Sequence, residues 1–458
     1  MTDLPDGWAM TTLGQLGKYL NGRGFKKSEW SDSGWPIIRI QNLTRAGGGF
    51  NYYSGPIEDR YKVANGDFLI SWAATLGAFI WRGPEAVLNQ HIFKVESYIE
   101  KKFHYYLVQH LLDDLMRSTH GSGMVHVTRQ RFDGQPVRLP PLPEQRRIVA
   151  ALEEHLARIM SSQQGVRRSV KRLDVLQRSL RQVVLCGGNP PPERLPHGWR
   201  WGKLRDVIDG VDAGRSFACH PRPARADEWG VVKVSAMTWG TFRPHENKAV
   251  PVDCPINEAH RIGSGDLLIS RANTEAYVGA PVIVRDIQSN LLLSDKSLRL
   301  RMTAGIDKEW LLQILSSPFV RRQVSKRATG TKDSMRNISQ KALLDVDIPI
   351  PPPGQQTVIA SWLSEQLEGL KRMEAELGAV LIQGDLLRAG LFQAAFDGQL
   401  VPQDPNDEQA SELLARIRAE RAAAPPKQKT PSRRTRKELA APPTRVTGDD
   451  YQQEALPL

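Results

Sequence analysis

The side chains best suited to chemistry in this sequence are cations and forked hydrogen-bond donors, clustered between predicted strands. Arg, Lys, Asn and Gln can read guanine and adenine edges, and Lys and Arg also hold phosphates. One set comprises Arg23, Lys26, Lys27, Arg39, Gln41, Asn42, Arg129 and Arg131; the second comprises Arg215, Lys233, Arg271, Asn273, Thr274, Lys332, Arg336 and Asn337. Any one of them is more often a solvated surface residue, but their repetition at corresponding positions favours DNA binding.

Residue patterns for catalysis are missing. A DNA methyltransferase grips its flipped base with an Asn/Asp-Pro-Pro-aromatic face, and the segment 189–192, Asn-Pro-Pro-Pro, lacks the aromatic residue. No glycine-rich loop ends in Lys-Ser/Thr, so a P-loop is absent. Adjacent carboxylates such as Glu153 and Glu154 lie on a predicted helix, where neighbouring side chains point about 100° apart and cannot form one metal clamp. We therefore predict no catalytic residue.

The histidines and cysteines are predicted to be structural. No histidine stands at a metal-binding spacing from another ligand, and His91, His104 and His110 are interpreted as core or surface histidines. The three cysteines, Cys186, Cys219 and Cys254, form no closely spaced pair, which predicts reduced thiols. We expect no metal site on this chain.

Composition predicts a protein of two or three ordinary domains with a polyanionic partner. The chain has 458 residues, 40% of them hydrophobic and 24% charged, and a formal net charge of +12. Residues 401–458 are nearly neutral, so the excess positive charge lies in the body of the chain. No apolar run could span a membrane and the first ten residues are polar, from which we expect a cytoplasmic location.

An internal repeat organises the sequence. The phrase Leu-Pro-x-Gly-Trp occurs at 4–8 and again at 195–199. Predicted half-buried strands follow at 37–44 and 231–238, and then Gly-Asp turns lead into short apolar strands at 66–71 and 265–270. The spacing between copies grows along the chain, as expected of a duplicated fold with diverged loops.

A long helix is predicted after each copy, because the apolar period changes to a heptad. The first seam is Val149, Leu152, Leu156, Ile159, Gln163, Val166, Val170, Leu173, Gln177, Leu180 and Val184; the second is Leu363, Gln366, Leu370, Met373, Leu377, Val380, Gly384, Leu387 and Leu391. Such narrow seams favour two helices packing against each other over helices that each cover their own domain. Residues proposed for this coiled coil or for partner docking are Leu152, Leu156, Ile159, Val170, Leu173, Leu370, Leu377 and Leu387.

The predicted fold class is α+β. Two similar mixed α/β recognition domains are separated by two long antiparallel coiled-coil helices with pseudo-two-fold symmetry. The predicted boundaries are 1–141 for the first domain, 142–187 for the first helix, 188–350 for the second domain, 351–400 for the second helix, and 401–458 for a short helix with a disordered basic tail.

The arrangement resembles the specificity subunits of type I restriction-modification systems. The resemblance covers almost the whole chain and rests on the paired openings, the paired Gly-Asp-x-Leu-Ile-Ser strands and the segments 139–148 and 387–402. It implies a non-catalytic subunit whose two domains each read half of an asymmetric bipartite site in double-stranded DNA. The helices would set the length of the unread DNA segment between the two half-sites.

The resemblance also implies partners. Two methyltransferase (modification) subunits would carry S-adenosylmethionine, and a restriction subunit would supply ATP-driven translocation and Mg²⁺-dependent cleavage, with no cofactor on this chain. One departure concerns the helix starts, where Glu144 and Gln145 are matched with Gly354 and Gln355, so the acid is lost in the second copy. Two other hypotheses remain: a self-contained methyltransferase or nuclease with unrecognised motifs, and an assembly scaffold that reads no sequence.

Overall fold

The computed structural model divides the chain into two compact units, and the two long helices contribute to both. Unit 1 comprises Met1–Gln163 with Ile382–Leu458, and unit 2 is Gln164–Leu381. The structure describes residues 4–44, 49–72, 75–117, 129–188, 195–216, 218–285, 287, 290–330 and 335–423, with only the backbone for 113–117. The predicted tail beyond 423 lies outside these residues.

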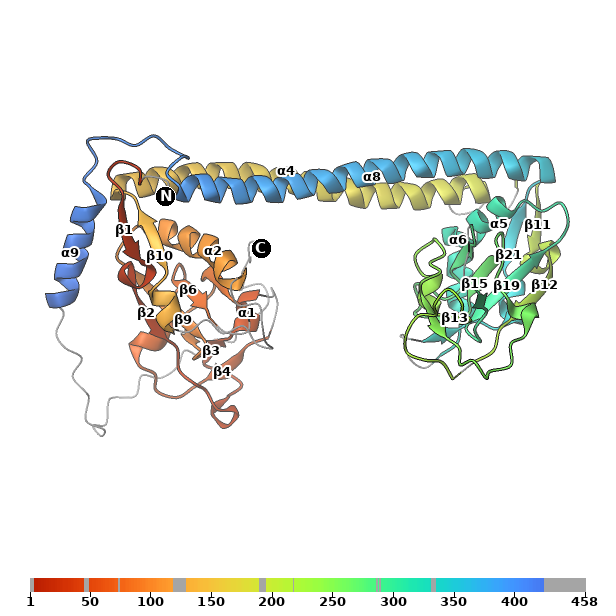
Figure 1. The fold of residues 1–458 in the computed structure, drawn as a ribbon, viewed down its shortest axis with the longest axis horizontal. Coiled ribbons are helices and arrows are strands. Elements are labelled where there is room, and N and C mark those ends of the chain that lie inside the picture. The colour runs from red at the N-terminus through yellow and green to blue at the C-terminus, as the bar shows by residue number, and fades with distance from the viewer. Residues whose placement is uncertain are drawn as a thin grey trace. The chain divides into compact units, whose positions relative to one another are not determined.

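The domain of unit 1 is built on two four-stranded sheets and a strand pair (Figure 1). An antiparallel sheet has the order β2-β9-β6-β7, and a mixed sheet has the order β4-β3-β8-β5, in which β3 and β8 are parallel. The strands are β1 Ala9–Thr12, β2 Gly17–Asn21, β3 Trp35–Ile38, β4 Asn51–Tyr53, β5 Lys62–Val63, β6 Phe68–Ser71, β7 Gly77–Ile80, β8 Ala86–Leu88, β9 Ile92–Ser97 and β10 Pro136–Leu139. The helices are α1 Ile40–Thr44, α2 Lys101–Arg117 and α3 Arg129–Asp133.

Unit 2 repeats this topology. Its antiparallel sheet has the order β12-β19-β15-β17, and its mixed sheet β14-β13-β18 again contains one parallel pair. The strands are β11 Arg200–Lys203, β12 Ile208–Ala213, β13 Gly230–Val232, β14 Asn247–Ala249, β15 Leu267–Ser270, β16 Ala272–Asn273, β17 Pro281–Ile283, β18 Leu291–Leu292, β19 Ser297–Met302, β20 Arg336–Asn337 and β21 Asp347–Ile350. The helices are α5 Lys308–Leu315, α6 Pro318–Arg327 and α7 Gln340–Leu344.

The repeated turns explain the repeated sequence phrases. Gly7 and Gly198 have φ of +79° and +84°, which only glycine adopts without strain, and the following Trp8 and Trp199 each donate a backbone N–H back across the turn. Both Gly-Asp turns lead directly into the central strands β6 and β15, as predicted. The internal repeat is therefore a repeat of structure as well as of sequence.

The strands predicted at 37–44 and 231–238 are too long. β3 ends at Ile38 and the chain turns into α1; β13 ends at Val232 and a short 3-10 helix spans Val234–Ala236. In the first case the Asn42 side chain accepts a hydrogen bond from the backbone N–H of Arg39 at 3.1 Å. This local bond replaces the ladder that a continued strand would need.

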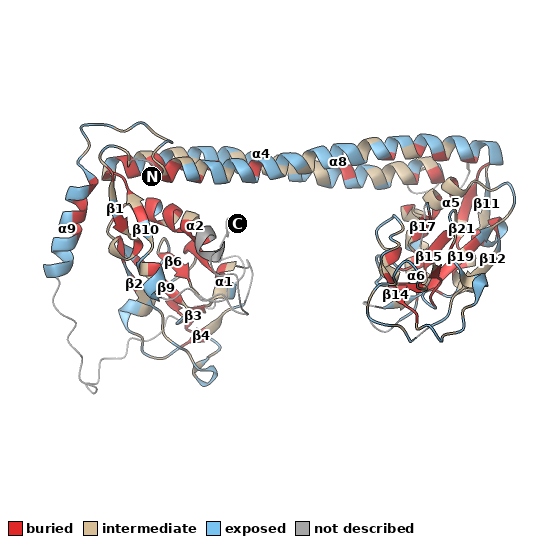
Figure 2. Cartoon of the chain, in the orientation of Figure 1, coloured by how far each residue is buried: buried red, intermediate tan, exposed pale blue. Residues whose placement is uncertain are grey.

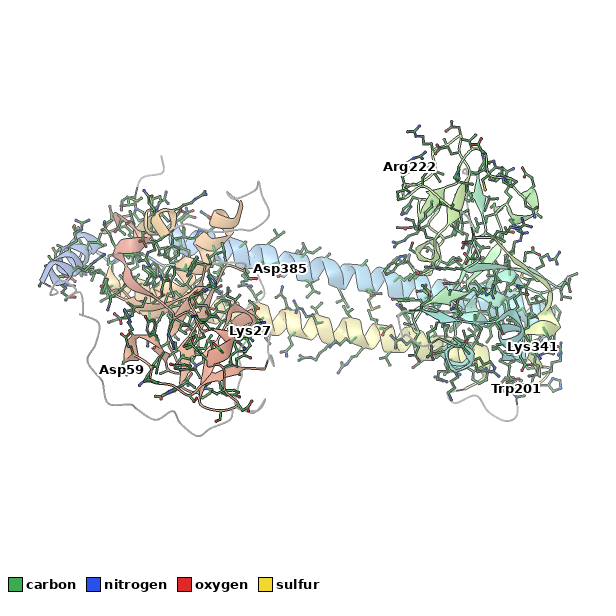
Figure 3. All side chains as sticks on the ribbon, turned by 90° about the horizontal axis from the view of Figure 1, so that it is seen from below. Lys27, Asp59, Trp201, Arg222, Lys341 and Asp385 are labelled. Atoms are coloured by element: carbon green, nitrogen blue, oxygen red, sulfur yellow. The ribbon has the colours of Figure 1, made fainter. Side chains whose placement is uncertain are left out.

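The two long helices are α4, Leu142–Cys186, and α8, Pro353–Phe396. Unit 1 contains the start of α4 and the end of α8, which run antiparallel there, and unit 2 contains the other two halves, also antiparallel (Figure 1). In unit 1, Gln163 Nε2 donates to Asp385 Oδ1 at 2.9 Å, where Asp385 is labelled on α8 (Figure 3). A Cβ at Gly384 would lie 2.6 Å from the Gln163 amide nitrogen, so the Gln163 side chain would have to shift to admit it.

The residues of the seam predicted for α4 face inward. In α8, every second residue of the predicted seam is exposed, and the residue that follows it in the sequence is the one at the inward position. Of the predicted α8 positions, Gln366, Met373, Val380 and Leu387 are exposed, Leu387 to 64%. The inward positions one residue later include Leu367, which is 3% exposed, and Leu381. Heptad spacing alternates three and four, and the sequence admits both orders because Leu367 and Leu381 each follow directly after a residue of the predicted seam.

The helix starts correspond differently from the sequence prediction. Gln145 donates to the Pro140 carbonyl and accepts from the backbone of Glu100, while Gln356 donates to the Pro351 carbonyl and accepts from the backbone of Asp307. Gln145 therefore corresponds to Gln356, not to Gln355. The partner of Glu144 in the repeat is then Gln355, and the acid is replaced by its amide rather than lost.

The indole hydrogen bonds support this match. Trp8 Nε1 donates to Glu144 Oε2 at 3.1 Å, and Trp199 Nε1 donates to Gln355 Oε1 at 2.9 Å. In unit 1 the pair is covered by the segment after α8, because Gln403 also donates to Glu144. Burial raises the pKa of Glu144.

The main core of each unit joins its antiparallel sheet to its halves of the long helices. Figure 2 shows buried residues concentrated in the sheets and in the helix ends that cover them. Leu152 and Leu156 enter the core of unit 1, whereas Leu363 and Leu367 enter that of unit 2. The helices thus cover domains as well as pairing, which combines the two alternatives that the sequence left open.

A last helix, α9 (Ala410–Ala423), packs on unit 1 through Leu413, Leu414 and Ile417. It coincides with the short helix predicted before the tail. Among the residues that the structure describes, no helix is long and apolar enough to cross a membrane.

Candidate nucleic-acid interface

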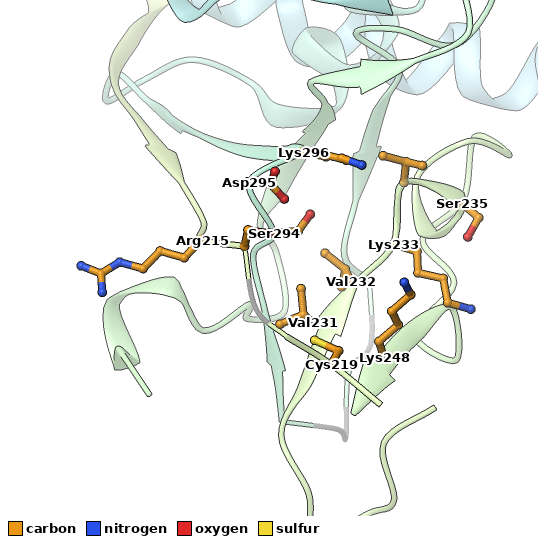
Figure 4. Close-up of a pocket in the computed structure, with 12 residues that line it drawn as sticks. Arg215, Cys219, Val231, Val232, Lys233, Ser235, Lys248, Ser294, Asp295 and Lys296 are labelled. Atoms are coloured by element: carbon orange, nitrogen blue, oxygen red, sulfur yellow. The ribbon is translucent and has the colours of Figure 1, made fainter. Parts of the chain in front are cut away.

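A cationic cavity lies beside the mixed sheet of unit 2 (Figure 4). Its volume is about 430 Å³, and four cations line it: Arg215, Lys233, Lys248 and Lys296. Asp295 is the acid in the lining, and Ser216, Ser235 and Ser294 add hydroxyl groups. Cations with interspersed hydroxyls suit the phosphates and base edges of DNA.

The sheet positions these groups from segments distant in sequence. β13 pairs with β18 in parallel, and the loop after β18 forms a bridge between Ser294 and Arg215. Lys233 follows β13, and Lys248 lies in β14 on its other side. In Figure 4, Lys233 and Lys248 lie near each other, while the Arg215 side chain extends away from them.

Lys233, one of the cavity lysines, has an acidic neighbour. Lys233 Nζ lies 3.2 Å from Glu246 Oε2, which also accepts from the Ser235 hydroxyl at 2.8 Å. The Ser235 hydrogen bond, followed by that of Lys233, lowers the pKa of Glu246. Glu246 therefore offsets part of the positive charge of Lys233 at neutral pH.

A second group of predicted residues is brought together next to this cavity. β16 pairs with β20, which places Asn273 opposite Arg336 and Ala272 opposite Asn337. Arg271 connects this pair to the cavity, because its backbone N–H donates to the Lys296 carbonyl at 2.9 Å. The predicted residues Arg215, Lys233, Arg271, Asn273, Thr274, Arg336 and Asn337 thus belong to one connected region, whereas Lys332 lies outside the described residues.

Asn273 has a structural task within this region. Its amide nitrogen donates to the hydroxyls of Thr238 and Ser270, at 3.2 and 3.3 Å, and its oxygen accepts from the Thr274 backbone at 2.9 Å. It holds the loop that presents Thr274, which is exposed.

An aromatic platform near Thr238 was missed by sequence reasoning. Trp239 is 54% exposed, its ring lies 6.2 Å from that of exposed Tyr277, and the Arg243 guanidinium lies 5.0 Å above it. Lys248 and Lys296 were missed as well. Single Trp and Lys residues carry no spacing signal, and only the folded sheet brings them to the predicted cluster.

The equivalent position in unit 1 has different chemistry. Arg23 forms a bridge with Asn89, as Arg215 does with Ser294. Its guanidinium lies 4.9 Å from the ring centres of both Phe25 and Tyr53 and pairs with Glu29. Hydrogen bonds and charge from Tyr53 and Glu29 outweigh burial and raise the pKa of Arg23. The sequence predicted that Arg23 contacts DNA, and in the structure its guanidinium packs on two aromatic rings and pairs with Glu29.

Asn42 is a further correction. It is fully buried, and its amide nitrogen donates to the Gly49 carbonyl at 3.3 Å, so its side chain does not face DNA. Lys26, Lys27 and Gln41 are exposed, and Lys27 is labelled in Figure 3. Arg39 lies 5.4 Å from the Trp30 ring, and Gln90, missed in the sequence, is exposed in the loop after β8. Unit 1 therefore presents both amides and cations.

Arg129 and Arg131 are two more of the predicted DNA-binding residues, and Arg336 does not stand at the corresponding position of unit 2. They lie in α3, whose repeat partner is α7, because both helices precede the strand that pairs with the opening strand of their unit. Arg129 pairs with Asp133 at 2.6 Å and lies 5.0 Å from the Phe93 ring. Its side chain packs against the antiparallel sheet.

Possible catalytic and metal-binding groups are engaged structurally where they can be seen. Glu153 pairs with Lys102 and Glu154 with Arg158. His104 is fully buried between Tyr19 and Ser97, at 2.9 Å from each hydroxyl, and burial lowers its pKa to about 3. Within the described ranges, no cluster of three or more His, Cys, Asp or Glu could hold a metal ion, and the three cysteines are free.

Comparison with known proteins supports the resemblance that the sequence suggested. Residues 5–171 match the model of the type I restriction modification DNA specificity domain. The EcoBI specificity subunit of Escherichia coli is 21% identical over 93% of this chain and 94% of its own length. The EcoEI specificity subunit of Escherichia coli is 29% identical, over 41% of this chain and 32% of its own length. Over nearly its whole length, this chain is similar to a type I restriction enzyme specificity subunit.

A solved structure supports the fold. A chain from work on complex assembly and conformational transition of the type I R-M system covers 87% of this chain and 100% of its own, with a TM-score of 0.63 and 20% identity. The mixed domains and long helices are therefore a known architecture.

Proposed function

We propose that this chain is the sequence-reading subunit of a type I restriction-modification enzyme, with each unit reading one half of an asymmetric bipartite DNA target. The observation that carries the proposal is the bridge position after β8 and β18. The same backbone register presents Asn89, Gln90 and His91 in unit 1 and Ser294, Asp295 and Lys296 in unit 2. The same backbone position therefore carries different hydrogen-bonding side chains in the two units, which suits the reading of two different half-sites.

The partners and chemistry belong to the same proposal. Two methyltransferase subunits would bring S-adenosylmethionine, and a restriction and translocation subunit would bring ATP and Mg²⁺, while this chain supplies no catalytic group. The EcoBI relative is named as a subunit of a type I restriction enzyme, which supports such partners. A cytoplasmic location, with access to the cell's DNA, completes the proposal.

Reconstitution separates this function from a self-contained enzyme. The purified chain, its modification subunits and the mixture would each be incubated with labelled S-adenosylmethionine and a random DNA library. We expect methylation only in the mixture, at one bipartite sequence. Methyl transfer by the chain alone would overturn the proposal, and methylation without sequence preference would favour a scaffold.

A further inference from the structure

A cavity rich in arginine lies within unit 2, apart from the cavity of Figure 4. Its volume is about 710 Å³, and its lining comes from the last third of α4, the start of α6 and Ala276. Arg178, Arg181, Arg321 and Arg322 face it, against a single acid, Asp174. Asp174 already pairs with Arg178 at 2.6 Å, so it does not neutralise the others.

Two of these arginines, Arg181 and Arg321, are half-buried, and neither forms an ion pair with a carboxylate among the described residues. Arg321 Nη2 donates to the Ala276 carbonyl at 3.1 Å, but its Nη1 is buried with no hydrogen-bond partner among the described residues. Arg181 Nε donates to the neutral amide of Gln313 at 3.3 Å. Burial lowers the pKa of Arg181 and lowers that of Arg321 to about 10. An unpaired charge that is partly shielded from water is costly to a fold, which indicates a missing anion.

Other polar atoms in the lining are also unsatisfied. Gln177 Nε2 and Gln182 Oε1 are buried and have no partner in the described part of the chain. Gln177 would add a neutral donor beside the arginines. Buried polar groups normally have a hydrogen-bond partner, so several unsatisfied polar atoms around one cavity indicate that the cavity binds a ligand.

The repeat shows that this fold does not require arginine here. The match of Gln145 with Gln356 places Arg181 of α4 at the position of Phe392 in α8. Phe392 is buried, with its ring 6.0 Å from Tyr106 and 6.3 Å from Phe396. At this position unit 1 therefore has packed aromatic rings, whereas unit 2 has a cavity lined by charged side chains.

We propose that this arginine cavity of unit 2 binds a phosphate group. Guanidinium forks match phosphate oxygens, and a lining with four cations and one anion suits a dianion better than a single carboxylate. The phosphate could belong to the DNA backbone or to a free phosphate-bearing molecule. Only the first of these sources rests on the proposed function.

Pyrophosphate is the probe for the site itself. The full-length chain, in magnesium-free buffer at constant ionic strength, would be titrated with pyrophosphate and followed by calorimetry and thermal unfolding. R181Q/R321Q should bind at least tenfold more weakly than wild type, while R167Q/R168Q, which alters exposed arginines elsewhere on α4, should bind like wild type. Without ligand, R181Q/R321Q should unfold at the same temperature or higher, because it removes unpaired charge that is partly shielded from water. If that variant does not fold, R322Q at the exposed mouth replaces it, with a smaller loss expected.

A DNA-binding experiment shows which of the two sources supplies the phosphate. In complex with the modification subunits, a DNA phosphate held by the cavity would make the double variant lose about 0.9 from the slope of log affinity against log salt. An unchanged slope with lost pyrophosphate binding would assign a free phosphate ligand. Equal pyrophosphate binding by wild type and variant together with an unchanged slope would overturn the proposal. Sequence-specific binding by wild type tests the proposed function separately.

Discussion

Arg23 and Arg215 show how one backbone position can serve two purposes. Both lie in bridges to the loop after the parallel strand, yet Arg23 lies near two rings and pairs with Glu29, whereas Arg215 is exposed at a cavity. Residue type was predictable from the sequence. The contacts of the Arg23 side chain were not predictable, because they depend on Phe25 and Tyr53, which reach Arg23 only in the folded domain.

Alanine substitutions at these two positions should therefore act differently. R23A should lower the free energy of unfolding by about 1–2 kcal/mol through two lost cation–π contacts, and leave the salt dependence of DNA binding unchanged. R215A should leave stability nearly unchanged and reduce the salt slope by about 0.9. Denaturant unfolding and fluorescence anisotropy of the complex measure the two effects. A changed slope for R23A alone would reverse our assignment.

His104 predicts a dependence of stability on pH. Its pKa is lowered by burial to about 3, from an ordinary value near 6.5. Its neutral form contributes fully above pH 6.5, and the contribution is lost as pH falls toward 3, because the unfolded chain binds a proton that the fold excludes. The stability difference between wild type and H104Q should shrink by about 2 kcal/mol from pH 7 to pH 5. A constant difference in denaturant midpoints would show that His104 does not titrate this way.

At the scale of elements, the helices were predictable but their register was not. The sequence predicted helices over 142–187 and 351–400, and the structure has Leu142–Cys186 and Pro353–Phe396. Apolar residues also occur on the outer face of α8, including exposed Val380 and Leu387. A second possible seam therefore existed, and only packing against the domains and α4 selects between them.

Leucine truncations test the corrected register. L367A should lower the free energy of unfolding by about 2–5 kcal/mol, as buried leucine truncations do. L387A is the control on the same helix and should change it by less than about 0.5 kcal/mol. Thermal unfolding of the two variants measures this difference. Equal losses would mean that Leu387 is part of the seam after all.

The α9 helix depends on a few contacts with unit 1. Leu414 is buried in the core, and the backbone N–H of Ala410 donates to the Gly7 carbonyl at 2.9 Å. L414D should release the helix and speed hydrogen exchange over 410–423, while S411D, on the exposed face, should not. Unchanged exchange in L414D would mean that other contacts hold α9.

At the scale of the whole molecule, duplication was the strongest sequence signal. It predicted two similar α/β domains because the turns at Gly7 and Gly198 and the strands β6 and β15 keep their local chemistry. The sites within them were only partly predictable. Arg215, Lys233 and Arg271 do meet in unit 2, but Lys248 and Trp239 join them through the fold alone.

The helix starts show the same limit. Alignment by spacing matched Gln145 with Gln355, and hydrogen bonding moved the match by one residue to Gln356. Consequently Glu144 faces Gln355 in the repeat, and the units differ there in charge but share the tryptophan hydrogen bond. A one-residue slip is invisible in a sequence that has glutamine at both positions.

An exchange of reading domains tests the central claim most directly. Residues 13–139 would be replaced by the matching segment of a similar specificity subunit, and the chain expressed with its modification subunits in cells whose methylated sequences are then determined. We predict that one half of the methylated sequence changes while the other half and the unread gap stay the same. A change in both halves, or in neither, would contradict the claim that each unit reads its own half-site.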